Sequence, residues 1–218
     1  MPPNQCARFV ENPTELHAEA VKRIGRYLLG TADQGLIFHP SKDNTSFDCW
    51  VDASHAGEWR KHGDEAINDP STAKSRSGYV LLYASCPIVW ASKLQTEIAL
   101  SSTEAKYIAI SSAMREIIPL LRLIDEVKQH GLPINVGKSQ VHCRIFEDNS
   151  GALEMACAPK IRPRTKHINI KYHHFLSFVT AGLLSLYAVT SEEQFADIFT
   201  KPLADIPFMK HRKAIMGW

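Results

Sequence analysis

The chain has 218 residues, 44% hydrophobic and 22% charged, which is long enough to bury a core and typical of a globular protein. Its net charge of +2 is too small to indicate a nucleic-acid partner, so that inference needs local clusters of Lys and Arg. Five cysteines without a CxxC pair argue against a disulfide framework and a thiolate zinc site, and no apolar run reaches the ~20 residues of a membrane helix.

The first predicted element is an amphipathic helix over residues 14 to 29. Leu16, Ala20 and Ile24 recur at helical spacing, and Gly30 is expected to end the helix. A turn-rich stretch follows, and we place a domain boundary near residue 45.

Three strands are expected next. FDCWVDA, at residues 47 to 53, is a short β-prone run bounded by turn signals. GYVLLYA and PIVWASK are so close in sequence that they should form a hairpin around Ser85 to Pro87. Between the first strand and this hairpin lies a long polar segment, from Ser54 to Arg76, and a loop of that length is usually functional or disordered.

A long helix is predicted from about Ser101, and Pro119 should kink it. The chain then alternates between a strand (VHCRIFE), a short helix (NSGALEMACA), a basic turn feeding a helix that Gly182 ends, and a strand (LLSLYAVT). A closing helix is expected from Ser191, and the segment ending at Trp218 should also be helical. This order of elements predicts an α/β fold with a mixed sheet.

Two acidic residues stand out in the first half of the chain. Asp52 closes a β-prone run, so its carboxylate should project from a strand end into a cleft; the alternative is a turn-forming Asp. Glu104 follows Ser101 by three residues, which is the pattern of a capping box, in which both side chains satisfy free N–H groups at a helix start. On local grounds the cap explains Glu104 better than a function does.

Two more acidic residues follow in the second half. Asp148 lies before Asn149 at a strand-to-helix junction, where its side chain could cap the helix. Ser191 and Gln194 form a capping pair for the closing helix, so Asp197 has no capping role, and a charge among apolar neighbours favours a partner or a metal. The alternative for Asp197 is an exposed helix position. Successive acids are 52, 44 and 49 residues apart, so only tertiary folding can gather them.

The sequence motifs around these acids resemble those of a known family. WVDASHAG, SRSGY, VWASKLQTEIALSSTEAKYIA, EDNSGAL, RTKHINIKYHH and ADIFTKPL, in this order, resemble the ribonuclease H domain at the end of the polyprotein of copia-type LTR retrotransposons. Residues 14 to 38 resemble the tail of that family's reverse transcriptase. The resemblance implies three parts: a reverse transcriptase tail at 1–45, a ribonuclease H-like domain with a mixed sheet of about five strands at 46–204, and a helical tail at 205–218.

The resemblance also implies an activity. Ribonuclease H hydrolyses the RNA strand of RNA–DNA hybrids, and the family's pattern assigns Asp52, Glu104, Asp148 and Asp197 to the binding of two Mg2+ ions, for which Mn2+ can substitute. Two hard cations ~4 Å apart can hold both oxygens of an in-line displacement, and carboxylates suit Mg2+ as ligands. We therefore expect all four acids to converge around the end of the first strand.

Two partners are implied, an RNA–DNA hybrid and the upstream reverse transcriptase domain of the same polyprotein. An A-form hybrid is recognised by shape and phosphate positions rather than by base sequence. A run of basic residues is expected to hold the backbone of the hybrid. The alternative is that this run is a solvated basic loop. This basic run consists of Lys160, Arg162, Arg164, Lys166 and Lys171.

The sequence further predicts an intracellular protein. The N-terminus lacks the apolar core of a signal peptide, so we expect a chain that is not secreted and has no membrane partner. The resemblance implies that it resides in a cytoplasmic retrotransposon particle. The alternative to an enzyme is a catalytically inactive transposon remnant, or a module that binds hybrids without cutting them.

Overall fold

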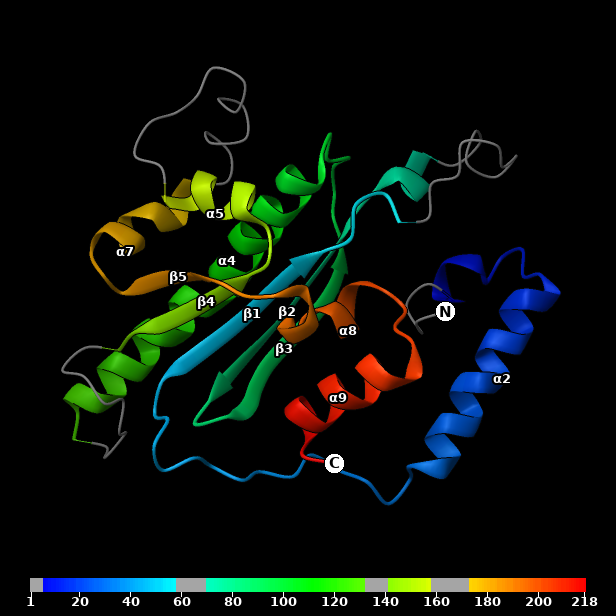
Figure 1. The fold of residues 1–218 in the computed structure, drawn as a ribbon, viewed down its shortest axis with the longest axis horizontal. Coiled ribbons are helices and arrows are strands. Elements are labelled where there is room, and N and C mark those ends of the chain that lie inside the picture. Colours follow the sequence, from blue (N-terminus) through cyan, green and yellow to red (C-terminus); the bar gives the residue numbers. More distant parts are fainter. Residues whose placement is uncertain (1–5, 58–69, 132–140, 158–172) are drawn as a thin grey trace.

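The computed structural model describes residues 6–57, 70–131, 141–157 and 173–218, and its centre is one five-stranded mixed sheet (Figure 1). The spatial order of the strands is β3-β2-β1-β4-β5. The predicted mixed sheet of about five strands, flanked by helices, is confirmed. The strands are β1 (Phe47–Ala53), β2 (Arg76–Tyr83), β3 (Cys86–Leu94), β4 (Cys143–Glu147) and β5 (Leu184–Ala188).

The central strand β1 sets the direction of its neighbours. It pairs antiparallel with β2 and parallel with β4, while β4 pairs parallel with β5. Nearly every residue of β1 is buried, because helices cover both faces of the sheet at this strand. The carboxyl ends of β1, β4 and β5 therefore meet at one edge of the sheet.

The predicted hairpin between β2 and β3 is confirmed. Ala84 and Ser85 form its turn with φ of 51° and 67°, and two successive positive φ values are characteristic of the tight turn that matches the twist of antiparallel strands. The pairing register shifts between Leu81 and Leu82. The hairpin supplies the antiparallel half of the sheet.

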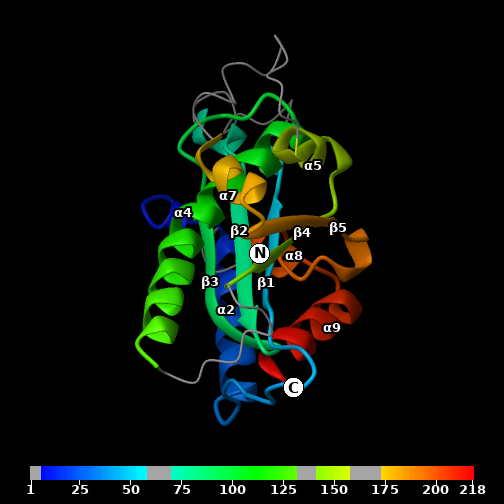
Figure 2. The same cartoon turned by 90° about the vertical axis from the view of Figure 1, so that its left-hand side faces the viewer.

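One face of the sheet is covered by α4 (Ser102–Gln129), which runs through Pro119 as a single helix (Figure 2). Ser101 caps its start by accepting a hydrogen bond from the Glu104 N–H at 3.1 Å. The inward side of α4 contributes Ala109 and Ala113 to the main core, where they pack among the buried side chains of β1 and β2. These small residues allow the helix to approach the sheet closely.

Two shorter helices flank the same layer. α5 (Ser150–Cys157) follows β4, and α7 (Leu176–Thr180) precedes β5. Phe175 is fully buried there, with its ring 5.8 Å from that of Tyr107 on α4. The chain leaves α7 through Gly182, whose φ of +72° suits the left-handed end of a helix, as predicted.

The opposite face of the sheet is covered by α8 (Asp197–Thr200) and α9 (Asp205–Met216) (Figure 2). Gly78 of β2 lies opposite Asp52 of β1, and a Cβ at Gly78 would lie 2.7 Å from both Phe199 Cβ and Thr200 Cγ2. α8 therefore packs directly on the backbone of β2. The predicted terminal helix is confirmed as α9, which buries Ile215 against this face.

The predicted closing helix from Ser191 is wrong as a single element. The chain forms a 3-10 turn, η5 (Ser191–Glu193), and starts a separate helix at Asp197. Ser191 and Gln194 are not a capping pair, because the Ser191 hydroxyl donates to Asp148 Oδ2 at 2.9 Å and the Gln194 amide donates to Val51 O at 3.0 Å. Polar partners that are distant in the sequence override the local cap pattern.

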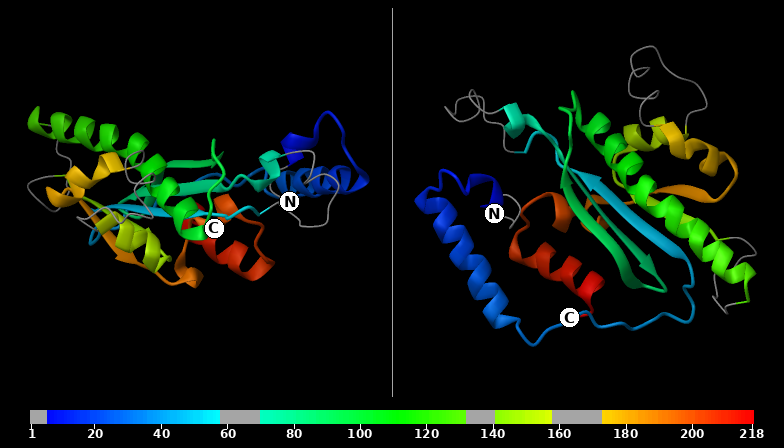
Figure 3. Two further views of the ribbon diagram at one scale, coloured as in Figure 1. Left: turned by 90° about the horizontal axis from the view of Figure 1, so that it is seen from above. Right: turned by 180° about the vertical axis from the view of Figure 1, so that it is seen from behind.

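The predicted first helix is confirmed as α2 (Glu15–Gly30), which lies beside the sheet domain (Figures 1 and 3). Its links to α9 are an exposed ion pair from Arg23 to Asp205, at 3.6 Å, and an edge contact between the Tyr27 and Phe208 rings. The division into three parts at 45 and 204 stays a prediction. No helix in the described ranges combines the length and apolar character that a membrane crossing requires.

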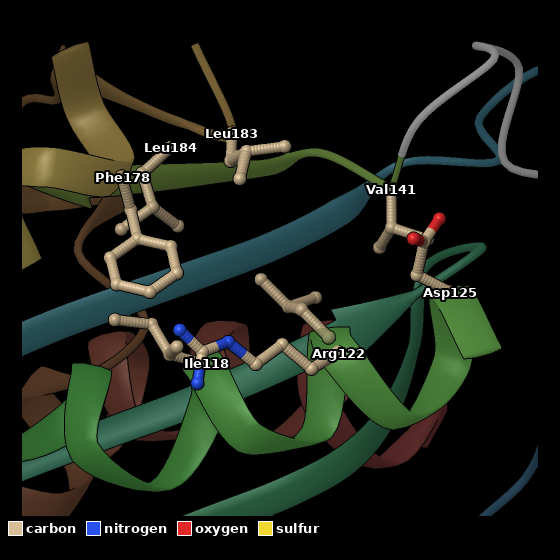
Figure 4. A pocket seen from close by; sticks show the side chains of 8 residues that line it. Ile118, Arg122, Asp125, Val141, Phe178, Leu183 and Leu184 are labelled. Atoms are coloured by element: carbon tan, nitrogen blue, oxygen red, sulfur yellow. The ribbon is translucent and has the colours of Figure 1, made fainter. Parts of the chain in front are cut away.

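A cavity of about 150 Å³ opens between α4, α7 and the starts of β4 and β5 (Figure 4). The Arg122 guanidinium lies 5.0 Å from the centre of the Phe178 ring, which forms one wall with Leu184. Its lining is mostly apolar, and it lies at the amino ends of the parallel strands. This cavity is therefore remote from the edge where the acids gather.

Candidate metal centre at the carboxyl edge of the sheet

Three carboxylates meet where β1 and β4 end. Asp52 is the penultimate residue of β1, Glu147 is the last residue of β4, and Asp148 comes directly after it. Because the two strands are parallel neighbours, these positions lie at the same edge of the sheet. One oxygen from each lies within 4.8 Å of the others, the only such group of three or more possible metal ligands in the described ranges. Two of the four predicted acids belong to this group.

A lysine from α4 stands at the centre of this group. Lys106 Nζ donates to Asp52 Oδ1 at 2.5 Å, to Glu147 Oε1 at 3.2 Å and to Asp148 Oδ1. The Lys106 side chain is only 11% exposed, and those of the three acids are 10% exposed or less. The acids and the lysine thus form one buried ionic cluster, which we call the Lys106 cluster.

Glu104 is buried near the start of α4. The Glu104 carboxylate accepts a hydrogen bond from the Leu100 N–H at 2.8 Å. The predicted capping box is therefore present only in part, since Glu104 binds the N–H of Leu100 and not that of Ser101. Glu104 is not in the group of three acids.

Asp197 is placed beside the Lys106 cluster by α8. Its pKa is raised to about 6, chiefly because it is buried and also because Asp52 is close, although Lys201 opposes this shift. Lys201 Nζ lies 2.8 Å from Asp197 Oδ1. Thr200, in the same helix, donates a hydrogen bond from its hydroxyl to Asp52 Oδ2. Three of the four predicted acids are therefore gathered, two inside the group and one next to Asp52.

Burial and charge act in opposite directions on Glu147 and Asp148, at the end of β4. Burial raises the pKa of Glu147 to about 8, and the attraction of Lys106 offsets only part of that effect. Asp148 is less buried, and hydrogen bonds from Lys106 and Ser191 lower its pKa to about 2 in spite of the burial. Burial thus favours the protonated form of Glu147, whereas the hydrogen bonds favour the ionised form of Asp148.

The Lys106 ammonium responds to the same neighbours. Burial disfavours its charged form, but Glu147, Asp52 and Asp148 together hold the pKa of Lys106 well above its ordinary value. The lysine is therefore a permanent cation at this edge of the sheet.

The donor set fits a divalent cation, on two grounds. Three carboxylates offer oxygens at a mutual spacing that one ion can span, and oxygen ligands are those that Mg2+ and Mn2+ take. Glu147 is fully buried, and among the described residues no donor faces its Oε2. The oxygens of Asp52 and Asp148 nearest the cluster centre are already hydrogen-bonded to Lys106.

The predicted basic run lies outside the described residues. Lys160, Arg162, Arg164, Lys166 and Lys171 all fall within 158–172, so their part in binding stays a prediction.

Sequence reasoning missed Glu147 and Lys106. Glu147 had a signal, since it stands next to Asp148 at the end of a predicted strand. Lys106 precedes Ile110, Ala113 and Ile117 by 4, 7 and 11 residues, and all three are fully buried in the core. That spacing places position 106 on the inward stripe of the helix, where a lysine needs a buried partner.

Comparison with known proteins places this chain among transposon polyproteins. It is 34% identical, over 97% of its length, to the retrovirus-related Pol polyprotein from transposon RE1 of Arabidopsis thaliana. It is also 34% identical, over 89% of its length, to that from transposon TNT 1-94 of Nicotiana tabacum. The chain corresponds to 13% of the length of each relative. No protein-family model matches it. Among solved structures, LC11-RNase H1, isolated from compost, covers 72% of this chain and 93% of its own length, with 13% identity and a TM-score of 0.47.

Proposed function

Because this chain belongs to the retrovirus-related Pol polyproteins of copia-type transposons, we propose that it is their ribonuclease H segment, a metal-dependent phosphodiester hydrolase. Its substrate is the RNA strand of RNA–DNA hybrids formed in reverse transcription. The observation that carries the proposal is the convergence of Asp52, Asp148 and Asp197, from three distant parts of the sequence, at one edge of the sheet.

We assign the cation ligands from the residues that meet at this edge. Asp52, Glu147 and Asp148 would hold one Mg2+ or Mn2+ ion, and Asp197, beside Asp52, would extend the site towards a second. A bound divalent cation supplies charge stabilisation at a phosphoryl oxygen and lowers the pKa of bound water. The protein's own contribution is orientation: Thr200 holds Asp52 and Ser191 holds Asp148, each through a hydroxyl hydrogen bond. Glu104 supports the start of α4 rather than reaching the ligands.

The proposed substrate contacts come from residues other than the clustered acids. We assign the hybrid backbone to the basic run at 160–171, because phosphate contacts by Lys and Arg position a nucleic acid without reading its bases. The upstream reverse transcriptase domain is the proposed partner for α2, whose exposed apolar residues include Leu16, Leu28 and Leu29. Leu16 and Leu29 are 75% and 81% exposed, which favours a covering partner in the longer polyprotein.

A second candidate function is hybrid binding without cleavage. The observation that favours it is the ammonium of Lys106 among the three acids, since a bound cation would have to share those oxygens with it. This candidate keeps the same substrate and removes the chemistry.

A cleavage assay decides between the two candidates. An RNA–DNA hybrid labelled on the RNA strand is incubated with the wild type, with Asp148→Asn, and with Asp205→Asn as an exposed acid control. Cation-dependent cleavage by the wild type and the control, lost in Asp148→Asn, supports the hydrolase. Binding of the hybrid without cleavage, in Mg2+ and in Mn2+, would favour the binding module.

A further inference from the structure

We infer that Lys106 is a built-in counter-cation that excludes divalent metal from the acid cluster, so that metal binds only when this side chain is displaced. This inference deepens the proposed function and rests on it for the identity of the site, since it concerns the same carboxylates. It assigns to position 106 the control of metal affinity.

The first ground is occupancy. Lys106 Nζ is within hydrogen-bonding distance of one oxygen from each of Asp52, Glu147 and Asp148, and these are the three residues whose oxygens a single cation can span. An ammonium and a metal ion cannot both stand at the centre of the same oxygens. Binding of the metal therefore breaks three hydrogen bonds of Lys106.

The second ground is charge. A unit charge within about 4 Å of a divalent ion repels it by more than the energy of a tenfold change in affinity, even at an effective dielectric constant of about 20. Lys106 is too buried for water to screen this repulsion fully, because only 11% of its side chain is exposed. The repulsion disappears only if the ammonium moves away from the ligands.

The third ground is the surroundings of the lysine. Lys106 stands in the second turn of α4, which begins at Ser102, and its side chain is buried against the three acids. A buried ammonium at such a place is held by its acidic partners, and its removal leaves carboxylates facing one another. Those carboxylates need another cation, and a divalent ion meets that need.

The direct test is calorimetric titration of the purified 218-residue chain with Mn2+. We compare wild type, Lys106→Gln, and Lys93→Gln as the matched control, since Lys93 forms an exposed ion pair with Glu116 at 3.3 Å. Lys106→Gln should bind Mn2+ at least about tenfold more tightly than wild type, because one repelling unit charge is removed. Lys93→Gln should bind as wild type does. Equal affinity in wild type and Lys106→Gln would overturn the inference.

A thermal readout keeps the test independent of activity. In chelator, Lys106→Gln should melt below wild type, since its acids are uncompensated, and saturating Mn2+ should raise its melting temperature by several degrees more than that of wild type. The double variant Lys106→Gln with Asp148→Asn should lose that gain.

The outcomes separate this inference from the proposed function. If Lys106→Gln binds Mn2+ more tightly but neither it nor the wild type cleaves the hybrid, the counter-cation is supported and the hydrolase is contradicted. Cation-dependent cleavage by wild type, together with unchanged Mn2+ affinity in Lys106→Gln, would support the hydrolase and contradict the counter-cation.

Discussion

Two charged clusters share the strands β1 and β4 and differ in the number of acids that each cation must neutralise. Asp48 and Asp52 point to the same face of β1, four residues apart. Asp48 meets one cation, Arg144, through two hydrogen bonds of 2.6 Å, from Nε to Oδ1 and from Nη2 to Oδ2. Asp52 shares one cation, Lys106, with two further acids. The Asp48 pair is matched in charge and geometry and is complete by itself, whereas the Lys106 cluster holds more acid than its lysine can neutralise.

This difference indicates which acids are structural. A bidentate Arg–carboxylate pair satisfies both partners, so it offers nothing to a ligand. An excess of buried carboxylates costs folding free energy, and a chain carries such an excess where a further cation or a reaction uses it. The ratio of acids to cations thus distinguishes Asp48 from Asp52, although the alternation of β1 places both on the same face.

The largest expected contrast is in hydrolysis. Asp52→Asn should lower the rate of hybrid cleavage about a hundredfold or more, because losing a cation ligand removes several kcal/mol of transition-state stabilisation. Asp48→Asn should leave that rate within about twofold and instead lower the free energy of unfolding by about 1 to 2 kcal/mol. Cleavage at saturating Mn2+, with Lys106→Gln as an alternative background, and urea unfolding measure the two effects. Equal rates in the two variants would remove the distinction between the clusters.

The next contrast concerns the cations. Lys106→Met should cost about 3 kcal/mol of unfolding free energy at neutral pH, because it strands several buried acids. Arg144→Met should cost less, about 1 to 2 kcal/mol, because it strands one acid that still accepts a hydrogen bond from Asn44. Urea denaturation without metal gives both values. A greater loss in Arg144→Met would mean that the acid excess is not a source of instability.

A smaller effect is expected in the pH dependence of stability. The pKa of Glu147 is about 8 in the folded chain and 4.5 in the ordinary case, so the folded state favours the protonated acid. The stability contributed by this group is therefore present below the unfolded value and is lost as pH rises through about 8. Glu147→Gln stays neutral and should melt several degrees above wild type at about pH 9, with a smaller difference at about pH 5. Melting curves across this range give the answer, and a difference that shrinks as pH rises would contradict it.

The smallest expected effect comes from the hydroxyl that supports Asp52. Thr200→Val keeps the shape of the side chain and removes its hydrogen bond to Asp52 Oδ2, which should cost about 1 kcal/mol. Thermal melting measures this loss. Thr31→Val, which removes an exposed hydroxyl bond to Tyr27 O, is the control and should change stability by less.

Periodicity and turn chemistry predicted most of the fold, and the site only in part. β1, the β2–β3 hairpin and the start of α4 at Ser101 each have a strong local signal, because alternation, a tight turn and a cap act within a few residues. The single helix predicted from Ser191 was wrong, since the Ser191 hydroxyl and the Gln194 amide bind partners more than 40 residues away. Lys106 was missed for the same reason: its partners lie on strands that only the folded sheet brings to α4.

The absent side chain at Gly78 has a consequence for how such transposon segments should be compared. α8 rests on the backbone at Gly78, and through that contact Thr200 reaches Asp52 and Asp197 stands beside it. The space between Gly78 and α8 is too small for one methyl group. A related segment with a larger residue at this position could therefore keep every acid and still separate the carboxylates of Asp52 and Asp197. A survey that counts intact acids would class it as competent. The survey should also include the glycine opposite the first acid, because this glycine lets α8 pack closely enough on the sheet for both to contribute acids to one site.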